Sequence, residues 1–204
     1  MNEVAFSVAP FSWAILAITV VTSALALRSR SLEEGLLLYP WDIARRGQWY
    51  RLFTYGLVHA DVLHLLFNMI ALYSITFVLE QVMGTARYAA LYCGGMVLSA
   101  VIPAWRHRAN ERYSALGASG AVSALFFAGM LYFPTAKIGL LFLPIPLPWP
   151  LFAVLFIAVS IAGSRKNWGN IGHDIHLYGA LAGLLLTVLL DPRSLEIFLH
   201  GLLG

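Results

Sequence analysis

Residues 117–136 read GASGAVSALFFAGMLYFPTA, an uncharged run that begins with small side chains. A helix that crosses a bilayer needs about 20 predominantly apolar residues. The run therefore predicts a membrane helix, which we place at residues 116–133, with Ser119 close to its start.

Ser119 stands between small residues, so a substrate backbone could approach its hydroxyl. The first N–H groups of a helix have no partner within the helix and attract negative charge. A nucleophile beside an oxyanion site could be built in this way. Taken alone, however, the motif favours the alternative, a small-residue patch against which a neighbouring helix packs.

The composition is that of a polytopic membrane protein. Of the 204 residues, 60% are hydrophobic and 11% are charged, and the mean hydropathy is +0.77, whereas soluble domains carry about 25% charged residues. The net charge of +3 comes from arginines between apolar runs, and nothing resembles a nucleic-acid-binding stripe. The single Cys93 excludes an intrachain disulfide.

Six apolar runs predict an all-α, six-transmembrane-helix bundle that forms a single domain over residues 1–204. They lie at residues 10–27, 62–79, 88–105, 116–133, 149–162 and 175–190. We expect the first span to be retained, because no Lys or Arg precedes it as in a signal peptide.

Two connections have unusual compositions. Residues 28–61 mix arginines with Trp and Tyr, so we expect this first loop to be partly embedded in the membrane interface. Residues 143–150 read LPIPLPWP, and alternating prolines hold a chain extended, so the fifth helix can begin only around Trp149.

Polar residues gather where the even-numbered spans begin, and these beginnings share one side of the membrane. They are His59, His64 and Asn68 at the second span, Ser119 at the fourth, and His173 and His176 at the sixth. Ionisable groups within spans are costly and usually face a bundle interior or cavity, so this clustering indicates a function.

Acyl transfer needs a nucleophile, a base and oxyanion donors. Ser119 supplies a hydroxyl, and a histidine of the sixth span could accept its proton. His176 shares a helix face with Gly179 and Gly183, and such small residues permit close helix approach. The alternative for His176 is a structural hydrogen bond between helices.

His64 and Asn68 lie four residues apart, so both project from one helix face and could donate to an oxyanion. His59 need not share that face, and we expect it to tie the first loop to the bundle. Glu80 and Arg51 are interpreted as structural.

Together these residues resemble the rhomboid intramembrane serine proteases. The motifs that carry the resemblance are His59-x4-His64-x3-Asn68, Gly117-Ala118-Ser119-Gly120 and His176-x2-Gly179-x3-Gly183, within residues 49–190. The sequence departs from the family pattern at Tyr50, Thr76 and Ser123, and Ser123 occupies a site that in some members holds an aromatic residue under the histidine ring.

The resemblance implies a Ser119/His176 dyad without an aspartate and without a cofactor or metal. It selects His176 over His173, because the family's base precedes two spaced glycines. It implies an oxyanion hole of the Ser119 N–H, His64 and Asn68, with His59, Gly117, Gly120, Gly179 and Gly183 in supporting positions. The implied substrates are transmembrane helices cut in or near the lipid bilayer.

The membrane orientation is predicted differently by two arguments. Ten Lys and Arg lie in the odd-numbered loops and three elsewhere, so the positive-inside rule would place the active-site face in the cytoplasm. The resemblance implies the extracytoplasmic side of a prokaryotic cell membrane. We follow the resemblance, because an interfacial first loop is not an ordinary short loop.

Three alternatives remain at this stage. A catalytically inactive rhomboid-like binding factor would normally lack the serine or histidine. A small transporter should carry polar residues along the whole of the even-numbered spans. A zinc site at His173, His176, His59 and His64 would lack the Glu of His-Glu-x-x-His.

Substrate access is predicted to involve the fifth span. That span begins late after its prolines, and the polar residues 164–172 follow it directly before the histidines. A short helix with a flexible connection has few packing contacts to hold it, so the span and this loop are expected to form a gate.

Overall fold

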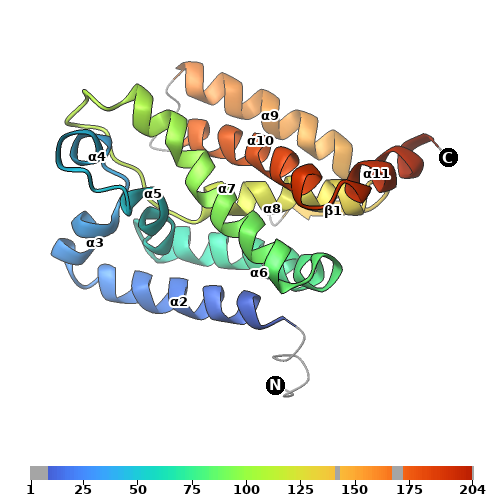
Figure 1. Ribbon diagram of the computed structural model, residues 1–204, viewed down its shortest axis with the longest axis horizontal. Coiled ribbons are helices and arrows are strands. Elements are labelled where there is room, and N and C mark those ends of the chain that lie inside the picture. Colours follow the sequence, from blue (N-terminus) through green and yellow to red (C-terminus); the bar gives the residue numbers. More distant parts are fainter. Residues whose placement is uncertain (1–8, 141–142, 167–171, 204) are drawn as a thin grey trace.

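The computed structural model describes residues 9–140, 143–166 and 172–203, and the fold is mostly helical. Apolar helices occupy all six predicted places (Figure 1): α2 (Pro10–Ala26), α6 (Val62–Met83), α7 (Thr85–Arg106), α8 (Ser119–Tyr132), α9 (Trp149–Lys166) and α10 (His173–Leu190). Of these, α6, α7 and α10 are long and apolar enough to cross a membrane, whereas α2, α8 and the stretch Trp149–Ser164 of α9 are shorter apolar helices.

The first connection folds into short helices that gather at one end of the bundle in Figure 1: α3 (Arg30–Leu36), α4 (Pro40–Arg46), α5 (Arg51–Thr54) and the 3-10 turn η1 (Tyr55–Leu57). Arg51 is buried there, and its guanidinium donates to the carbonyls of Glu34 and Leu37, both at 2.8 Å, and to Gln48 Oε1 at 2.6 Å. Its predicted structural role is therefore confirmed.

Glu80 fastens α2 to α6. Its buried carboxylate accepts hydrogen bonds from the backbone N–H groups of Phe11 and Ser12, at 3.1 and 2.7 Å, and from the Ser12 hydroxyl at 2.5 Å. Carboxylates that bind the free N–H groups of a helix start stabilise that helix. The structural interpretation of Glu80 is confirmed, and Thr76 extends the network by donating to Ser12 Oγ at 2.9 Å.

Small residues bring α7, α8 and α10 into backbone contact. A side chain added at Gly179 would collide with the backbone of Gly120, and one added at Gly183 would collide with that of Ala124. A Cβ at Gly95 of α7 would lie 2.6 Å from Ala124 Cβ. Contact of this kind gains dispersion energy that larger side chains would prevent.

The chain between α8 and α9 forms a hairpin of β1 (Lys137–Leu140) and β2 (Leu143–Pro148). The proline-rich stretch is thus extended, and the helix begins at Trp149, as the sequence predicts. The final helix, α11 (Arg193–Leu203), was not anticipated, and it follows α10 at the opposite end from α3 and α4 in Figure 1.

Candidate active site

The turn before Ser119 requires glycine at position 117. Gly117 has φ +112°, in the region that favours glycine, and its N–H donates to the Tyr55 carbonyl at 2.9 Å. A Cβ at this position would lie 2.8 Å from the His64 ring. Gly117 therefore lets the turn pass directly beside His64.

His59 holds the next residue of the turn. Its Nε2 accepts a hydrogen bond from the Ala118 N–H at 3.2 Å, and its Nδ1 lies 2.9 Å from the Ser23 hydroxyl, which bonds to the Leu57 carbonyl. Since Ser23 donates to that carbonyl, Nδ1 carries the proton and donates to Ser23. Burial, and then the neighbouring His64, lower the pKa of His59 to about 3. His59 thus ties the end of the first loop to Ser23 and Ala118, which agrees with the structural role predicted for it, and its ring is neutral.

A third attachment lies just upstream. Leu38 and Ala115 exchange backbone hydrogen bonds of 2.9 and 3.0 Å, which join the first loop to the segment before the turn. Tyr55 is fully buried behind the turn, and its hydroxyl donates to the Met96 carbonyl at 3.0 Å. The first loop therefore acts as the scaffold that presents Ser119.

Ser119 is the first residue of α8 and is half-buried. Its carbonyl accepts the Ser123 hydroxyl at 2.8 Å. Within the described residues its own N–H has no hydrogen-bond acceptor, as is usual in the first turn of a helix. Ser119 can therefore offer a hydroxyl and a backbone donor at one point.

His64 and Asn68 lie on α6 next to this turn. Asp61 caps the helix by accepting a hydrogen bond from the His64 N–H at 2.7 Å. The centroids of the His64 and His59 rings lie 5.0 Å apart. The Asn68 amide donates one hydrogen to the His64 carbonyl at 3.0 Å, so the second amide hydrogen remains for another acceptor. The structure thus brings His64 beside the Ser119 turn, with Asn68 one turn further along α6.

His176 lies in the first turn of α10, one turn before the contact of Gly179 with Gly120. That contact sets the start of α10 beside the start of α8. His173 instead faces α9, since a Cβ at Gly163 would lie 2.5 Å from its ring. Among the described residues, no hydrogen bond joins the Ser119 hydroxyl to the His176 ring.

One ring next to His176 comes from α9. The centroid of the Phe156 ring lies 6.1 Å from that of His176, with 34° between the planes. The Ser123 hydroxyl bonds to the Ser119 carbonyl of its own helix and not to the imidazole. No sequence pattern predicts the contact of Phe156 with His176, because the two residues lie on different helices.

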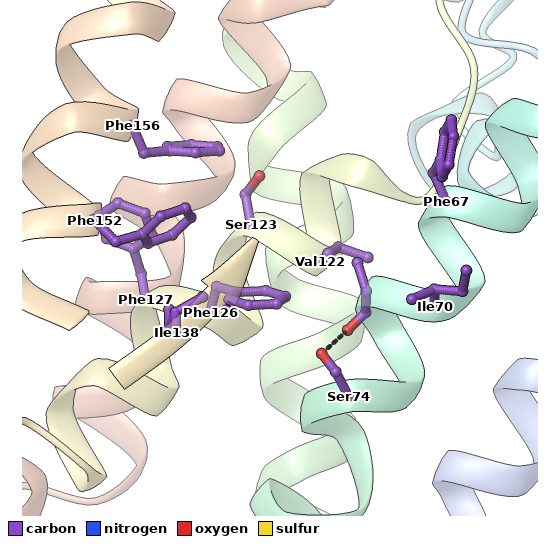
Figure 2. A pocket seen from close by; sticks show the side chains of 12 residues that line it. Phe67, Ile70, Ser74, Val122, Ser123, Phe126, Phe127, Ile138, Phe152 and Phe156 are labelled. Carbon is purple, nitrogen blue, oxygen red and sulfur yellow. Dashed lines mark hydrogen bonds between the residues drawn. The ribbon is translucent and has the colours of Figure 1, made fainter. Parts of the chain in front are cut away.

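A cavity of about 340 Å³ opens beside Ser123, one turn along α8 from Ser119. Figure 2 shows Phe152 and Phe156 of α9 and Phe126 of α8 on one side of it, with Phe67, Ile70 and Ser74 of α6 on the other. The lining is mostly aromatic and aliphatic, so the cavity suits an apolar group.

No group of three or more His, Cys, Asp or Glu side chains is arranged to hold a metal ion in the part of the chain that the structure describes. The predicted gate loop, residues 164–172, lies partly outside that part, because residues 167–171 are not described. Tyr55 and Ser23 support the site, and sequence reasoning missed both, because neither belongs to a local motif.

Comparison with known proteins gives concordant results. The Rhomboid domain family matches residues 46–193. The "Putative rhomboid protease YdcA" of Bacillus subtilis is 31% identical over 145 residues, which are 70% of this chain and 68% of the relative.

Two mitochondrial relatives are also similar. "Presenilin-associated rhomboid-like protein A, mitochondrial" of Danio rerio is 31% identical over 129 residues, and "Rhomboid protein 1, mitochondrial" of Saccharomyces cerevisiae is 30% identical over 131 residues. Each match covers 62% of this chain, but only 33% and 38% of the respective relatives.

Proposed function

Because the chain belongs to the rhomboid family, we propose that this integral membrane protein is a serine endopeptidase that cleaves transmembrane helices in or near the bilayer. The dyad is Ser119 and His176, as the family motif implies. The substrates are other membrane proteins that reach the site through lipid.

The observation that carries the proposal is the contact of Gly179 with the Gly120 backbone. It brings the helix start that bears His176 against the helix start that bears Ser119. Catalytic hydrogen bonds are often long in an empty site and tighten when substrate binds. A modest approach of the two side chains would then complete the dyad.

The reaction follows from the chemistry of these groups. The Ser119 hydroxyl attacks the scissile carbonyl carbon, His176 accepts its proton, and the negative charge develops on the carbonyl oxygen. The Ser119 N–H, the His64 ring and the free Asn68 amide hydrogen donate to that oxygen. His176 then returns the proton to the leaving amine, and water hydrolyses the acyl-enzyme by the reverse sequence.

The test is covalent labelling by a fluorophosphonate, followed by peptide mapping. We expect an adduct at Ser119 in the wild-type protein and none in Ser119→Ala. His176→Ala should abolish cleavage of a transmembrane reporter, whereas His173→Ala should retain it because His173 faces Gly163. Activity lost in His173→Ala but kept in His176→Ala would make the base assignment wrong.

A rhomboid-like binding factor without catalytic activity is the second candidate. It is compatible with the absence of a hydrogen bond between the Ser119 hydroxyl and the His176 ring among the described residues, an absence that an empty catalytic site also allows. Such a protein would bind transmembrane helices at the same cavity without reacting at Ser119. Absence of any adduct in a folded preparation would favour it.

Substrate access is assigned to the side of α9. Phe152 and Phe156 of this helix form one wall of the cavity in Figure 2, so its displacement would open the cavity from that side. Trp149 at its start is buried and packs against Gly129 of α8, where a Cβ would lie 2.5 Å from the indole. Trp149 therefore anchors the start of α9.

A further inference from the structure

The ends of three helices meet at Asp174, the second residue of α10. Asp174 Oδ2 lies 3.2 Å from Nη1 of Arg106, the last residue of α7. Asp174 Oδ1 accepts a hydrogen bond from the hydroxyl of Ser164, near the end of α9. The Asp174 side chain is only 16% exposed, so it is held between its partners.

The three helices differ in how firmly they are held. The backbones of α8 and α10 touch at Gly179 and Gly183, and Gly95 brings α7 against Ala124 of α8. By contrast, α9 meets its neighbours through rings: the Phe126 and Phe152 centroids lie 6.1 Å apart at α8, and the His173 ring of α10 lies against Gly163. Side chains change rotamer more easily than backbones separate, so α9 is the helix that a local bond can hold or release.

Asp174 is itself held in place by α10 and α7. It stands in the first turn of α10, where the helix dipole favours a carboxylate. Arg106, half-exposed, holds the same carboxylate from α7. Asp174 therefore belongs to the rigid part of the bundle and offers its second oxygen to α9.

We propose that Asp174 is a positioning residue that, anchored by Arg106 and bonded to Ser164, holds the active-site end of α9 and thereby limits the access of transmembrane substrates to Ser119. The inference rests on the proposed protease function. Phe156 lies two turns before Ser164 on α9, lines the cavity and contacts His176. Release of the Ser164 end would thus widen the cavity next to the reacting groups.

The first experiment removes the bond from the α9 side alone. Ser164→Ala leaves the Asp174–Arg106 pair intact, and we expect kcat/KM for a transmembrane substrate to rise by about two- to tenfold, as for loss of one hydrogen bond. Hydrolysis of a small soluble ester should not change, because it does not need α9 to move. Equal effects on both substrates, or no effect on either, would overturn the inference.

Two controls match this variant. Ser160→Ala makes the same substitution one turn earlier on α9. Arg108→Gln removes an arginine close to Arg106 whose guanidinium bonds to the Trp105 carbonyl and lies over the Trp105 ring. Both should behave as wild type with both substrates, and a rise as large as that of Ser164→Ala would contradict the assigned contact.

The second experiment locks the same contact. The double variant carries Ser164→Cys and Asp174→Cys in a Cys93→Ser background. Its activity is measured before and after oxidation to the disulfide. We expect the oxidised form to cleave the transmembrane substrate at least about tenfold more slowly, to hydrolyse the ester at the unchanged rate, and to recover on reduction. Undiminished cleavage by verified crosslinked protein would refute the role of α9.

Phosphonate labelling distinguishes a failure of the protease function from a failure of the role of Asp174. A wild-type protein that is never labelled contradicts the protease function itself. A labelled protein whose Ser164 variant matches wild type contradicts only the role of Asp174.

Discussion

Asn68 and His64 differ in what their removal should do to the site. Asn68→Ala removes one oxyanion donor and leaves the turn intact, so we expect a loss of about 10²-fold in kcat. His64→Ala should cost a similar factor and also empty the space beside Gly117. Turnover of a transmembrane reporter measures both, and phosphonate labelling checks that Ser119 stays reactive.

The matched control for this pair is Asp61→Ala. Asp61 caps the same helix start through the His64 N–H but has no proposed contact with the oxyanion. It should lower stability by about 1 kcal/mol, the usual effect of a lost cap, with a much smaller loss of kcat. Wild-type turnover in both the Asn68 and the His64 variants would end the oxyanion assignment.

Protonation of His59 should destabilise the fold. The unfolded chain binds a proton at this residue below about pH 6.5, whereas the folded chain does so only near the lowered pKa of about 3. The contribution of neutral His59 to the free energy of unfolding is therefore fully present above pH 6.5 and declines as the pH falls toward 3. Melting temperatures in detergent between pH 7 and pH 4.5 should show this decline.

A substitution isolates the contribution of His59 from that of other groups. His59→Gln keeps an acceptor for the Ala118 N–H and removes the titrating ring, so its melting temperature should depend less on pH over this range. His200→Gln, at an exposed position of α11, should keep the wild-type slope. If the melting temperatures of the His59 variant and of the wild type depend on pH in the same way, the proposed effect of His59 protonation is wrong.

At the scale of elements, the contact between α8 and α10 decides whether the site assembles. A methyl group at Gly179 would collide with the Gly120 backbone, which cannot move aside as a side chain can. Overpacking of this kind costs about 1–3 kcal/mol. We expect Gly179→Ala to lower both the melting temperature and phosphonate labelling of Ser119.

Gly35→Ala is the control for that substitution. Gly35 lies in α3, and nothing stands within 4 Å of the position that its Cβ would take. Alanine also favours a helix over glycine by about 1 kcal/mol. The Gly35→Ala variant should therefore be as stable as wild type or more so. If Gly35→Ala and Gly179→Ala lower the melting temperature equally, the effect at Gly179 is not due to the contact between α8 and α10.

At the scale of the whole molecule, the number of helices that cross the membrane decides on which sides the two termini lie. If all six apolar helices cross, both termini lie on one side. We expect the active-site end to face the extracytoplasmic side, as the rhomboid resemblance implies. The distribution of Lys and Arg predicts the opposite orientation.

Cysteine labelling in intact cells measures this orientation. In a Cys93→Ser background, Arg112→Cys reports the end of α7 nearest the active site, and Arg87→Cys reports its other end. We expect a membrane-impermeant maleimide to label only the first before permeabilisation. The reverse pattern would place the active site in the cytoplasm.

Much of this architecture followed from the sequence. The lengths of the apolar runs predict the six helices, and the prolines of residues 143–150 predict an extended segment, because both depend on local properties. The three spaced motifs sufficed to identify the rhomboid family, which the match over residues 46–193 confirms. The choice of His176 over His173 came from the family resemblance and stays a prediction.

Only the tertiary structure decided how these residues are held. The bond from His59 to Ala118, the contact of Phe156 with His176 and the junction of Arg106, Ser164 and Asp174 join helices that are distant in the sequence. No local pattern predicts such contacts, because they depend on where packed helices come to rest. The apolar runs fix which segments become helices, whereas the close approach of glycine-bearing backbones fixes which side chains meet.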